Sequence, residues 1–120
     1  MGCKMDKHQL LKRTKAFALE IIDFVSLLPN NNKGNIIGRQ ILKSGTSVGA
    51  NYRAACRAKS KDDFRYKIKI VEEEADETLY WLELILESKV LIGTKVEELI
   101  KEADELTAIF TSISKTSRNS

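Results

Sequence analysis

Residues 40–56 read QILKSGTSVGANYRAAC, a stretch without proline in which small residues stand where a helix usually carries large ones. Gly45 and Gly49 lie inside it, and a glycine inside a helix costs about 1 kcal/mol relative to alanine. The usual compensation is close approach by another helix or backbone, which only small side chains permit. The stretch therefore predicts a helix that packs tightly against a neighbour.

A helical projection sorts this part of the chain into three stripes. The apolar stripe contains Ile37, Ile41, Val48, Tyr52 and Ala55. The polar stripe beside it contains Gln40, Ser44, Ser47 and Asn51. The basic stripe, on the opposite side, contains Arg39, Lys43, Arg53 and Arg57. We expect the apolar stripe to face a core, the polar stripe with Gly45 and Gly49 to form a helix-packing or oligomer seam, and the basic stripe to face solvent or an anion.

Apolar residues recur at helical spacing in the rest of the 120-residue chain and predict three more helices. Capping boxes are expected at Asp6, Ser60 and Thr94, each followed three residues later by Gln, Asp or Glu. The four expected helices span residues 6–28, 35–57, 61–88 and 94–114, with a fraying polar tail from residue 114 to 120. Short loops between them predict one all-α domain over residues 1–120, an antiparallel up-down-up-down four-helix bundle.

The third expected helix is apolar nearly all round between residues 79 and 86. Such a surface predicts cover by another subunit, and the alternative is a wide core that leaves Tyr80 and Trp81 partly exposed. Glu74 and Glu77 share a band with Trp81, either as solvated charges or as half-buried partners of Arg or Lys across an interface. The interfacial interpretation is favoured, and a lone buried carboxylate would cost several kcal/mol. These three residues therefore join the expected oligomer seam.

Charge is distributed unevenly, although the formal net charge is only +3. Residues 33–69 carry ten Lys or Arg against two acids, whereas residues 71–88 carry seven acids and no base. Complementary contacts between helices or subunits are one interpretation, and nucleic-acid binding by the basic block is the other. The candidate nucleic-acid-binding residues are Arg39, Lys43, Arg53, Arg57, Lys59, Lys61, Arg65 and Lys69.

The residue types that catalysis or metal binding needs are scarce. His8 is the one histidine, so a bundle-type di-metal site with its two Glu-x-x-His motifs is not expected. Cys3 and Cys56 are too few for a disulfide framework, which favours a reducing, cytoplasmic location; Cys56 is interpreted as a structural thiol rather than a reactive one. No run approaches the 18 apolar residues of a membrane span. We expect no enzymatic activity, no cofactor, no metal and no membrane partner.

Three motifs together resemble the bacterial proteins named after the 23S rRNA intervening sequence. They are QILKSGTSVGAN at residues 40–51, SKDDF at residues 60–64 and EADETLYWLEL at residues 74–84, and Leu28-Pro29 adds to them. The resemblance implies a cytoplasmic four-helix bundle assembled as a ring-like homopentamer, with an activity that is undefined for most members. In a related branch, the accessory proteins of diversity-generating retroelements, it implies a basic pentamer that engages a reverse transcriptase and nucleic acid.

This chain departs from the common family pattern directly after Asn51. Many members continue Ile-Ala-Glu-Gly, whereas this chain continues Tyr52-Arg53-Ala54-Ala55, so no role of that glutamate carries over. The modest net charge favours the intervening-sequence branch over the retroelement branch. The leading hypothesis is an oligomeric scaffold that binds structured RNA or DNA through phosphate contacts. The alternative is a protein-interaction scaffold without nucleic-acid contact, in which Glu and Asp of a neighbour consume the basic side chains.

Overall fold

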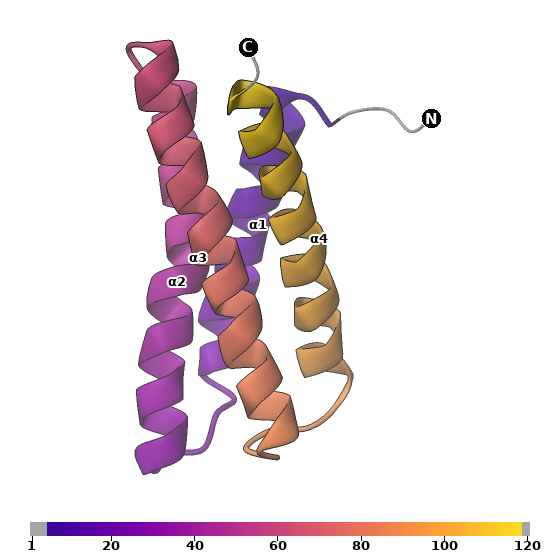
Figure 1. The fold of residues 1–120 in the computed structure, drawn as a ribbon. Helices are drawn as coiled ribbons and strands as arrows, with labels where there is room; N and C mark the ends of the chain where they lie inside the picture. The colour runs from indigo at the N-terminus through magenta and orange to yellow at the C-terminus, as the bar shows by residue number, and fades with distance from the viewer. Residues whose placement is uncertain (1–4, 119–120) are drawn as a thin grey trace.

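The computed structural model describes residues 5–118 and contains four helices within them, without a β-strand in that range. They are α1 (Lys7–Val25), α2 (Asn32–Cys56), α3 (Lys61–Glu87) and α4 (Thr94–Arg118). Successive helices run in opposite directions and are joined by short loops (Figure 1). Each helix packs along the next one in the chain, and α1 packs only loosely against α4. The expected all-α fold is confirmed.

Side-chain caps set three of the helix starts. The Asp6 carboxylate accepts a hydrogen bond from the Gln9 N–H at 2.8 Å, and the Gln9 side chain accepts one from the Asp6 N–H at 3.0 Å, which completes the predicted capping box. Ser60 caps α3 by accepting from the Asp63 N–H at 3.0 Å. The Asp63 carboxylate accepts from the Lys59 N–H instead of the Ser60 N–H, at 3.3 Å. The second hydrogen bond of the predicted capping box is therefore made by the N–H of the residue before Ser60.

The helix boundaries differ from the expected ones at several points. Helix α2 begins at Asn32 rather than near residue 35, because the Asn31 side chain accepts a hydrogen bond from the Gly34 N–H at 2.9 Å. Helix α1 ends at Val25, three residues before the expected end. Helix α4 begins with Thr94 itself and continues to Arg118, four residues beyond the expected end. The tail expected to fray is therefore helical as far as the structure describes it.

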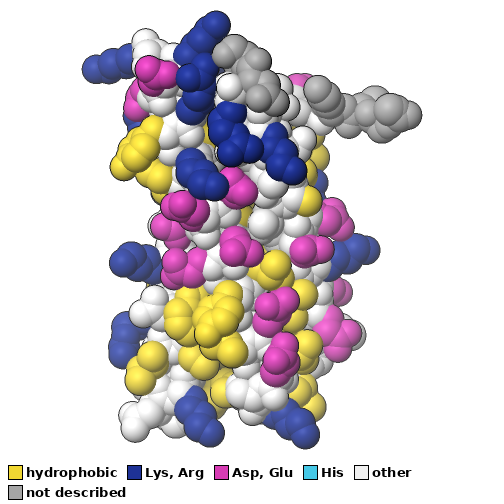
Figure 2. Space-filling model, viewed as in Figure 1, with side chains coloured by type: hydrophobic (Ala, Val, Ile, Leu, Met, Phe, Trp, Pro, Cys, Tyr) yellow, Lys and Arg dark blue, Asp and Glu magenta, His cyan; other side chains and the backbone are white. Residues whose placement is uncertain are grey.

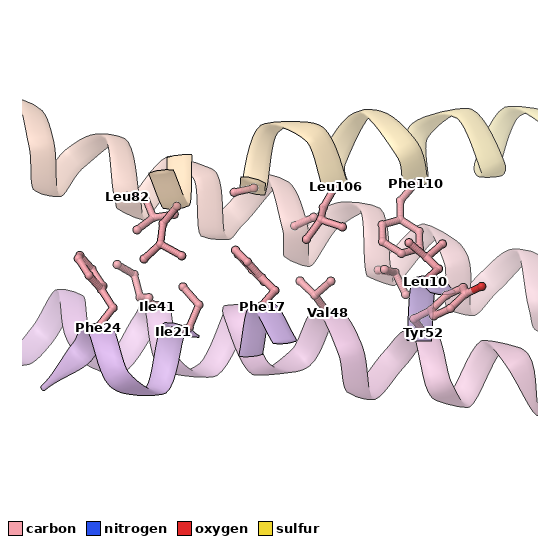
Figure 3. Close-up of a cluster of buried hydrophobic side chains, with 14 of the residues drawn as sticks. Leu10, Phe17, Ile21, Phe24, Ile41, Val48, Tyr52, Leu82, Leu106 and Phe110 are labelled. Atoms are coloured by element: carbon pink, nitrogen blue, oxygen red, sulfur yellow. The ribbon is translucent and has the colours of Figure 1, made fainter. Parts of the chain in front are cut away.

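The core is a row of large apolar side chains along the bundle axis. Figure 3 shows it running from Phe24, Ile41 and Leu82 at one end to Leu10, Tyr52 and Phe110 at the other. These side chains are at most 5% exposed. Burial of each contributes about 1.5–3 kcal/mol relative to exposure, so this row stabilises the arrangement of all four helices.

Glycines let α1 and α2 approach closely. A Cβ at Gly45 would lie 2.9 Å from Cγ1 and Cγ2 of Ile21, and one at Gly49 would lie 3.2 Å from the Thr14 carbonyl oxygen. Real Cβ atoms almost never come within 3 Å of such neighbours, so Gly45 is required where α2 crosses Ile21. The tight packing predicted from residues 40–56 is therefore present, and its partner is α1.

An ion pair joins α1 to α4. The Arg13 guanidinium donates to both carboxylate oxygens of Glu102, at 2.8 and 2.6 Å, and to Glu105 at 2.9 Å. The hydrogen bonds to Glu102 are the main reason that the pKa of Arg13 lies above its ordinary value. Bidentate pairs of this kind fix geometry as well as charge. Arg13 therefore connects two neighbouring helices that otherwise pack only loosely against each other.

Candidate nucleic-acid interface

The basic stripe of α2 lies on the outside of the bundle. Arg39, Lys43, Arg53 and Arg57 are exposed, and within residues 5–118 none of them forms a salt bridge. Burial raises the pKa of Glu74, and Lys43 lies close enough to that carboxyl to offset part of the rise. At 1.5 Å per residue, Arg39 and Arg57 lie about 27 Å apart along the helix. The stripe therefore presents positive charge over most of the length of α2.

Two lysines of α1 extend this charge. Lys7 and Lys15 line a groove of about 590 Å³ between α1 and α2, together with Arg53 and Arg57 of α2. All four side chains are exposed, and the groove has no acidic residue among its lining residues. Leu11, Thr46 and Ala50 are among the uncharged residues between them. We call this feature the α1–α2 groove. Four cations without a salt bridge in the described part of the chain therefore line one groove.

Lys7 and Lys15 were not among the residues predicted from the sequence. The available signal was their spacing, because residues 7, 11 and 15 follow one another at steps of four and share one face of α1. That spacing does not reveal that α2 brings Arg53 and Arg57 to the same groove. The groove depends on the pairing of α1 with α2, which a projection of one helix cannot show.

The candidate residues at the start of α3 are placed differently. Arg65 pairs with Asp62 at 3.0 Å and also donates to the Ser117 carbonyl of α4 at 2.8 Å. Lys69 lies 3.5 Å from Glu72. Lys59 and Lys61 are exposed and form no salt bridge among the described residues. Of the eight predicted cations, Arg65 and Lys69 are therefore already paired with acids. The other six form no salt bridge within the described residues.

Residues of the predicted seam lie on both flanks of α2. The hydroxyls of Ser44 and Thr78 are fully buried and hydrogen-bond across α2 and α3 at 2.9 Å. Ser47 donates to the Lys43 carbonyl and Asn51 donates to the Ser47 carbonyl, both within α2. Gln40 is half-buried. Ser44 thus joins α2 to α3, while Gly45 and Gly49 face α1.

Acidic and aromatic side chains share the outer face of α3. Burial is the main cause that raises the pKa of Glu74, and the charge of Glu77 adds to it. The Glu77 carboxylate accepts a hydrogen bond from the Trp81 indole at 3.2 Å. The Trp81 and Tyr80 rings pack edge to face, with their centroids 5.2 Å apart. Tyr80 is 53% exposed. Figure 2 shows Lys and Arg gathered where α3 begins, acids near the middle and hydrophobic side chains beyond them.

Other candidate groups are dispersed. His8 is exposed near the start of α1, and Cys56 is half-buried at the end of α2. Cys3 lies outside the described residues. Among residues 5–118, no three His, Cys, Asp or Glu side chains gather as a metal-binding group. None of the four described helices contains an apolar stretch long enough to cross a membrane.

Comparison with known families shows which family the chain belongs to. The sequence model of the 23S rRNA-intervening sequence protein family matches residues 6–112, which include α1, α2, α3 and most of α4. The chain belongs to this family. No curated protein shows significant similarity to the chain. The family assignment thus confirms the resemblance carried by the motifs in residues 40–51, 60–64 and 74–84.

A solved structure agrees with the fold. It is a protein of unknown function from the S23 ribosomal protein family of Bacteroides thetaiotaomicron, similar to this chain with 35% sequence identity and a TM-score of 0.83. The match covers 91% of this chain and 97% of the Bacteroides protein. The fold that the two proteins share therefore covers nearly the whole chain.

Proposed function

We propose that this protein is a non-enzymatic, oligomeric scaffold that binds structured RNA or DNA by contacting phosphates along the α1–α2 groove. The observation that carries the proposal is the convergence of Lys7, Lys15, Arg53 and Arg57 without an acidic residue in the groove. Phosphate contacts by Lys and Arg supply most of non-specific nucleic-acid affinity. Arg39 and Lys43 continue the positive surface along α2.

Repetition in an oligomer would strengthen a weak contact. A few phosphate contacts per chain give dissociation constants of roughly 10⁻⁴–10⁻⁶ M at physiological salt. Linked copies convert later contacts into intramolecular ones and raise the overall affinity by about 10²–10⁴. Self-association, with a ring-like pentamer as the expected form, is therefore part of the proposal. A reverse transcriptase or another protein partner is a further possibility that the family resemblance implies.

Charge reversal in the groove tests the proposal. The double variant Arg53→Glu/Arg57→Glu should lose at least about tenfold in affinity for a fluorescent RNA hairpin and for a duplex DNA of equal length at 50 mM salt. The slope of log affinity against log salt should flatten by about two, since each lost phosphate contact removes about one unit. Fluorescence anisotropy between 50 and 300 mM salt measures both quantities.

The matched control is Lys33→Glu/Lys101→Glu, which makes the same change in net charge at two exposed positions outside the groove. It should retain the parent slope and bind within about twofold of the parent protein. Equal losses in the two variants would show that net charge alone attracts nucleic acid. Unchanged binding in the groove variant would refute a role of the α1–α2 groove.

The second candidate is a protein-interaction scaffold without nucleic-acid contact. The outer face of α3 favours it, because Glu73, Asp76 and Glu77 are exposed beside Tyr80 and none forms a salt bridge within the described chain. Under this alternative, these acids bind the basic groove of a neighbouring copy. The variant Arg53→Glu/Arg57→Glu would then lower the mass of the assembly while RNA and DNA binding stayed negligible in the parent protein.

A further inference from the structure

A large cleft opens at the end of the bundle where α2 ends and α3 begins. Its volume is about 1140 Å³, slightly above the range of about 300–1,000 Å³ typical of small-molecule sites. Tyr52, Phe64, Ile109 and Ile113 form apolar parts of its wall, from α2, α3 and α4. We call it the terminal cleft. It lies where α1 and α4, the least closely packed neighbours, leave space beside the Arg13 ion pair.

The Tyr52 part of the wall is rigid and uncharged. Tyr52 is 5% exposed, and its ring packs against the buried Phe110 ring with the two centroids 5.3 Å apart. Burial is the main cause that raises the pKa of the Tyr52 hydroxyl, and its hydrogen bond with the Cys56 thiol adds to this. The hydroxyl therefore stays neutral at physiological pH. A ligand lying here would contact a fixed aromatic surface that bears no charge.

The rim of the cleft is positive. Its lining residues include Lys7, Lys59 and Lys61 in addition to Arg13, and none of them is acidic. Arg13 is already neutralised by Glu102 and Glu105 of α4. The three lysines are exposed and form no salt bridge within residues 5–118. They are the charges left to attract a ligand.

Three acids near the cleft do not cancel this charge fully. Asp6, whose charge adds to the effects of burial and Cys56 on the pKa of Tyr52, caps α1 by accepting a hydrogen bond from the Gln9 N–H. Asp62 pairs with Arg65, and Asp63 pairs with Lys67 while accepting from the Lys59 N–H. The hydrogen bond from Lys67 is the main reason that the pKa of Asp63 is lowered. The carboxylates of Asp62 and Asp63 therefore have partners on their own helix. The N-terminus of α3, whose dipole is positive, adjoins the same rim and adds to the field.

From this combination we infer that the terminal cleft binds a small amphipathic anion. Its apolar or aromatic body would lie against Tyr52, Phe64 and Ile109, and its carboxylate, sulfonate or phosphate would bind Lys59 and Lys61 at the rim. An anion without an apolar body would leave the wall in contact with water, and a neutral apolar molecule would leave the lysines without a partner. Lys7 lines both the terminal cleft and the α1–α2 groove, whereas Lys59 and Lys61 line the cleft alone, so a test at these two lysines is separate from the proposed nucleic-acid binding.

Binding of 1-anilinonaphthalene-8-sulfonate, an aromatic sulfonate whose fluorescence rises in apolar sites, tests the inference. The parent protein should bind it saturably at one site per chain. Lys59→Glu/Lys61→Glu should raise its Kd by about tenfold or more, while the Kd of the neutral dye Nile red changes by less than about twofold. Lys33→Glu/Lys101→Glu, which makes the same charge change away from the cleft, should leave both Kd values unchanged.

A variant that fills the cleft shows whether the dyes bind there or on another apolar surface. Ser112 is exposed and lines the cleft, so Ser112→Trp should abolish binding of both dyes without changing the helix content measured by circular dichroism. Glu98→Trp, at an exposed position of α4 outside the cleft, is the control for added aromatic surface. Displacement of the dye by laurate or by 2-naphthoate then distinguishes an aliphatic from an aromatic natural ligand.

Three results would overturn the inference. Equal dye affinity in Lys59→Glu/Lys61→Glu and in its control would remove the role of the rim lysines. Dye binding that survives Ser112→Trp would place the dye elsewhere, for example on Tyr80 and Trp81. Fewer than one dye per five chains at saturation, from an assembled parent protein, would show that a second copy covers the cleft instead of a small molecule.

Discussion

Glu74 carries a carboxylate that the fold holds in an unfavourable setting. Burial raises its pKa above the ordinary value of 4.5, Glu77 raises it further, and Lys43 offsets part of the effect. A raised pKa means that the folded chain binds this proton more tightly than the unfolded chain does. Ionised Glu74 therefore lowers the stability of the fold at neutral pH. Below pH 4.5, where the carboxyl is protonated in both states, this penalty disappears.

Glu74→Gln should accordingly raise the Tm at pH 7.5, and the gain should shrink as the pH falls to 4.5. The gain should be small, on the order of 1–3 °C, because solvent screens the exposed part of the carboxylate. Thermal melts followed by circular dichroism between pH 4 and 8 measure it. Glu73→Gln, at the exposed neighbouring position, is the control and should show no such pH-dependent gain. A lower Tm at pH 7.5 would mean that a cation of another subunit pairs with Glu74.

At the scale of single residues, sequence periodicity predicts which face of a helix a residue occupies, but not how deeply its side chain is buried. It placed Ser44, Ser47 and Asn51 on one flank of α2, yet only Ser44 is fully buried and meets another helix. Its partner, Thr78, did not stand out, because a threonine inside a helix carries no pattern of its own. Ser47 and Asn51 hydrogen-bond to carbonyls one turn back in the same helix, as short polar side chains often do.

At the scale of helices, two glycines of α2 differ in what surrounds them. An added Cβ at Gly45 would lie 2.9 Å from two carbons of Ile21, a core residue that has no room to move. At Gly38 the nearest atoms are ends of the Leu28 and Val25 side chains, at 3.3 and 3.4 Å. Both glycines are buried and helical. They therefore form a matched pair for testing how closely α1 and α2 must approach.

Gly45→Ala should destabilise the protein by about 1–3 kcal/mol, because overpacking against Ile21 outweighs the gain in helix propensity. Gly38→Ala should be neutral or stabilise it by up to about 1 kcal/mol, since the Leu28 and Val25 side chains can shift. Urea unfolding followed by circular dichroism gives both free energies of unfolding. Effects of equal sign at the two positions would contradict close packing at Gly45.

Helix starts are predictable where the cap is local, and helix ends are not. The Asp6 and Ser60 caps follow from residues three positions apart, and both are present. The start of α2 was misplaced because three consecutive asparagines offer several possible caps, of which Asn31 is used. Helix α4 continues beyond the last residue of its heptad pattern. The Arg65 side chain of α3 stabilises this end of the helix by donating a hydrogen bond to the Ser117 carbonyl. That contact joins residues far apart in the sequence.

At the scale of the whole molecule, α1 and α3 both carry apolar side chains that are exposed in the isolated chain. Tyr80 of α3 is 53% exposed and Ile36 of α2 is 52% exposed, while Leu19 and Ile22 of α1 are 57% and 48% exposed. Helices α1 and α3 are not packed against each other in the bundle. Contact between unlike faces of successive copies is heterologous and closes into a ring when the rotation permits. This arrangement supports the proposed ring-like assembly.

Molecular mass in solution tests that assembly directly. By analytical ultracentrifugation, the parent protein should sediment as an oligomer, with five chains expected. Tyr80→Glu should shift it toward single chains, because a charge placed among apolar side chains at an interface loses its hydration without gaining a partner. The helix content should stay at the parent level, since the Tyr80 side chain is exposed in the isolated chain.

The matched control is Ile92→Glu. Ile92 is 68% exposed but lies in the loop between α3 and α4, away from the sides of the bundle, so its charge should leave the mass unchanged. A loss of mass in both variants would point to general destabilisation rather than to the α3 face. A parent protein that sediments as one chain at micromolar concentration would refute the assembly, and with it the multivalent phosphate contacts that nucleic-acid binding requires here.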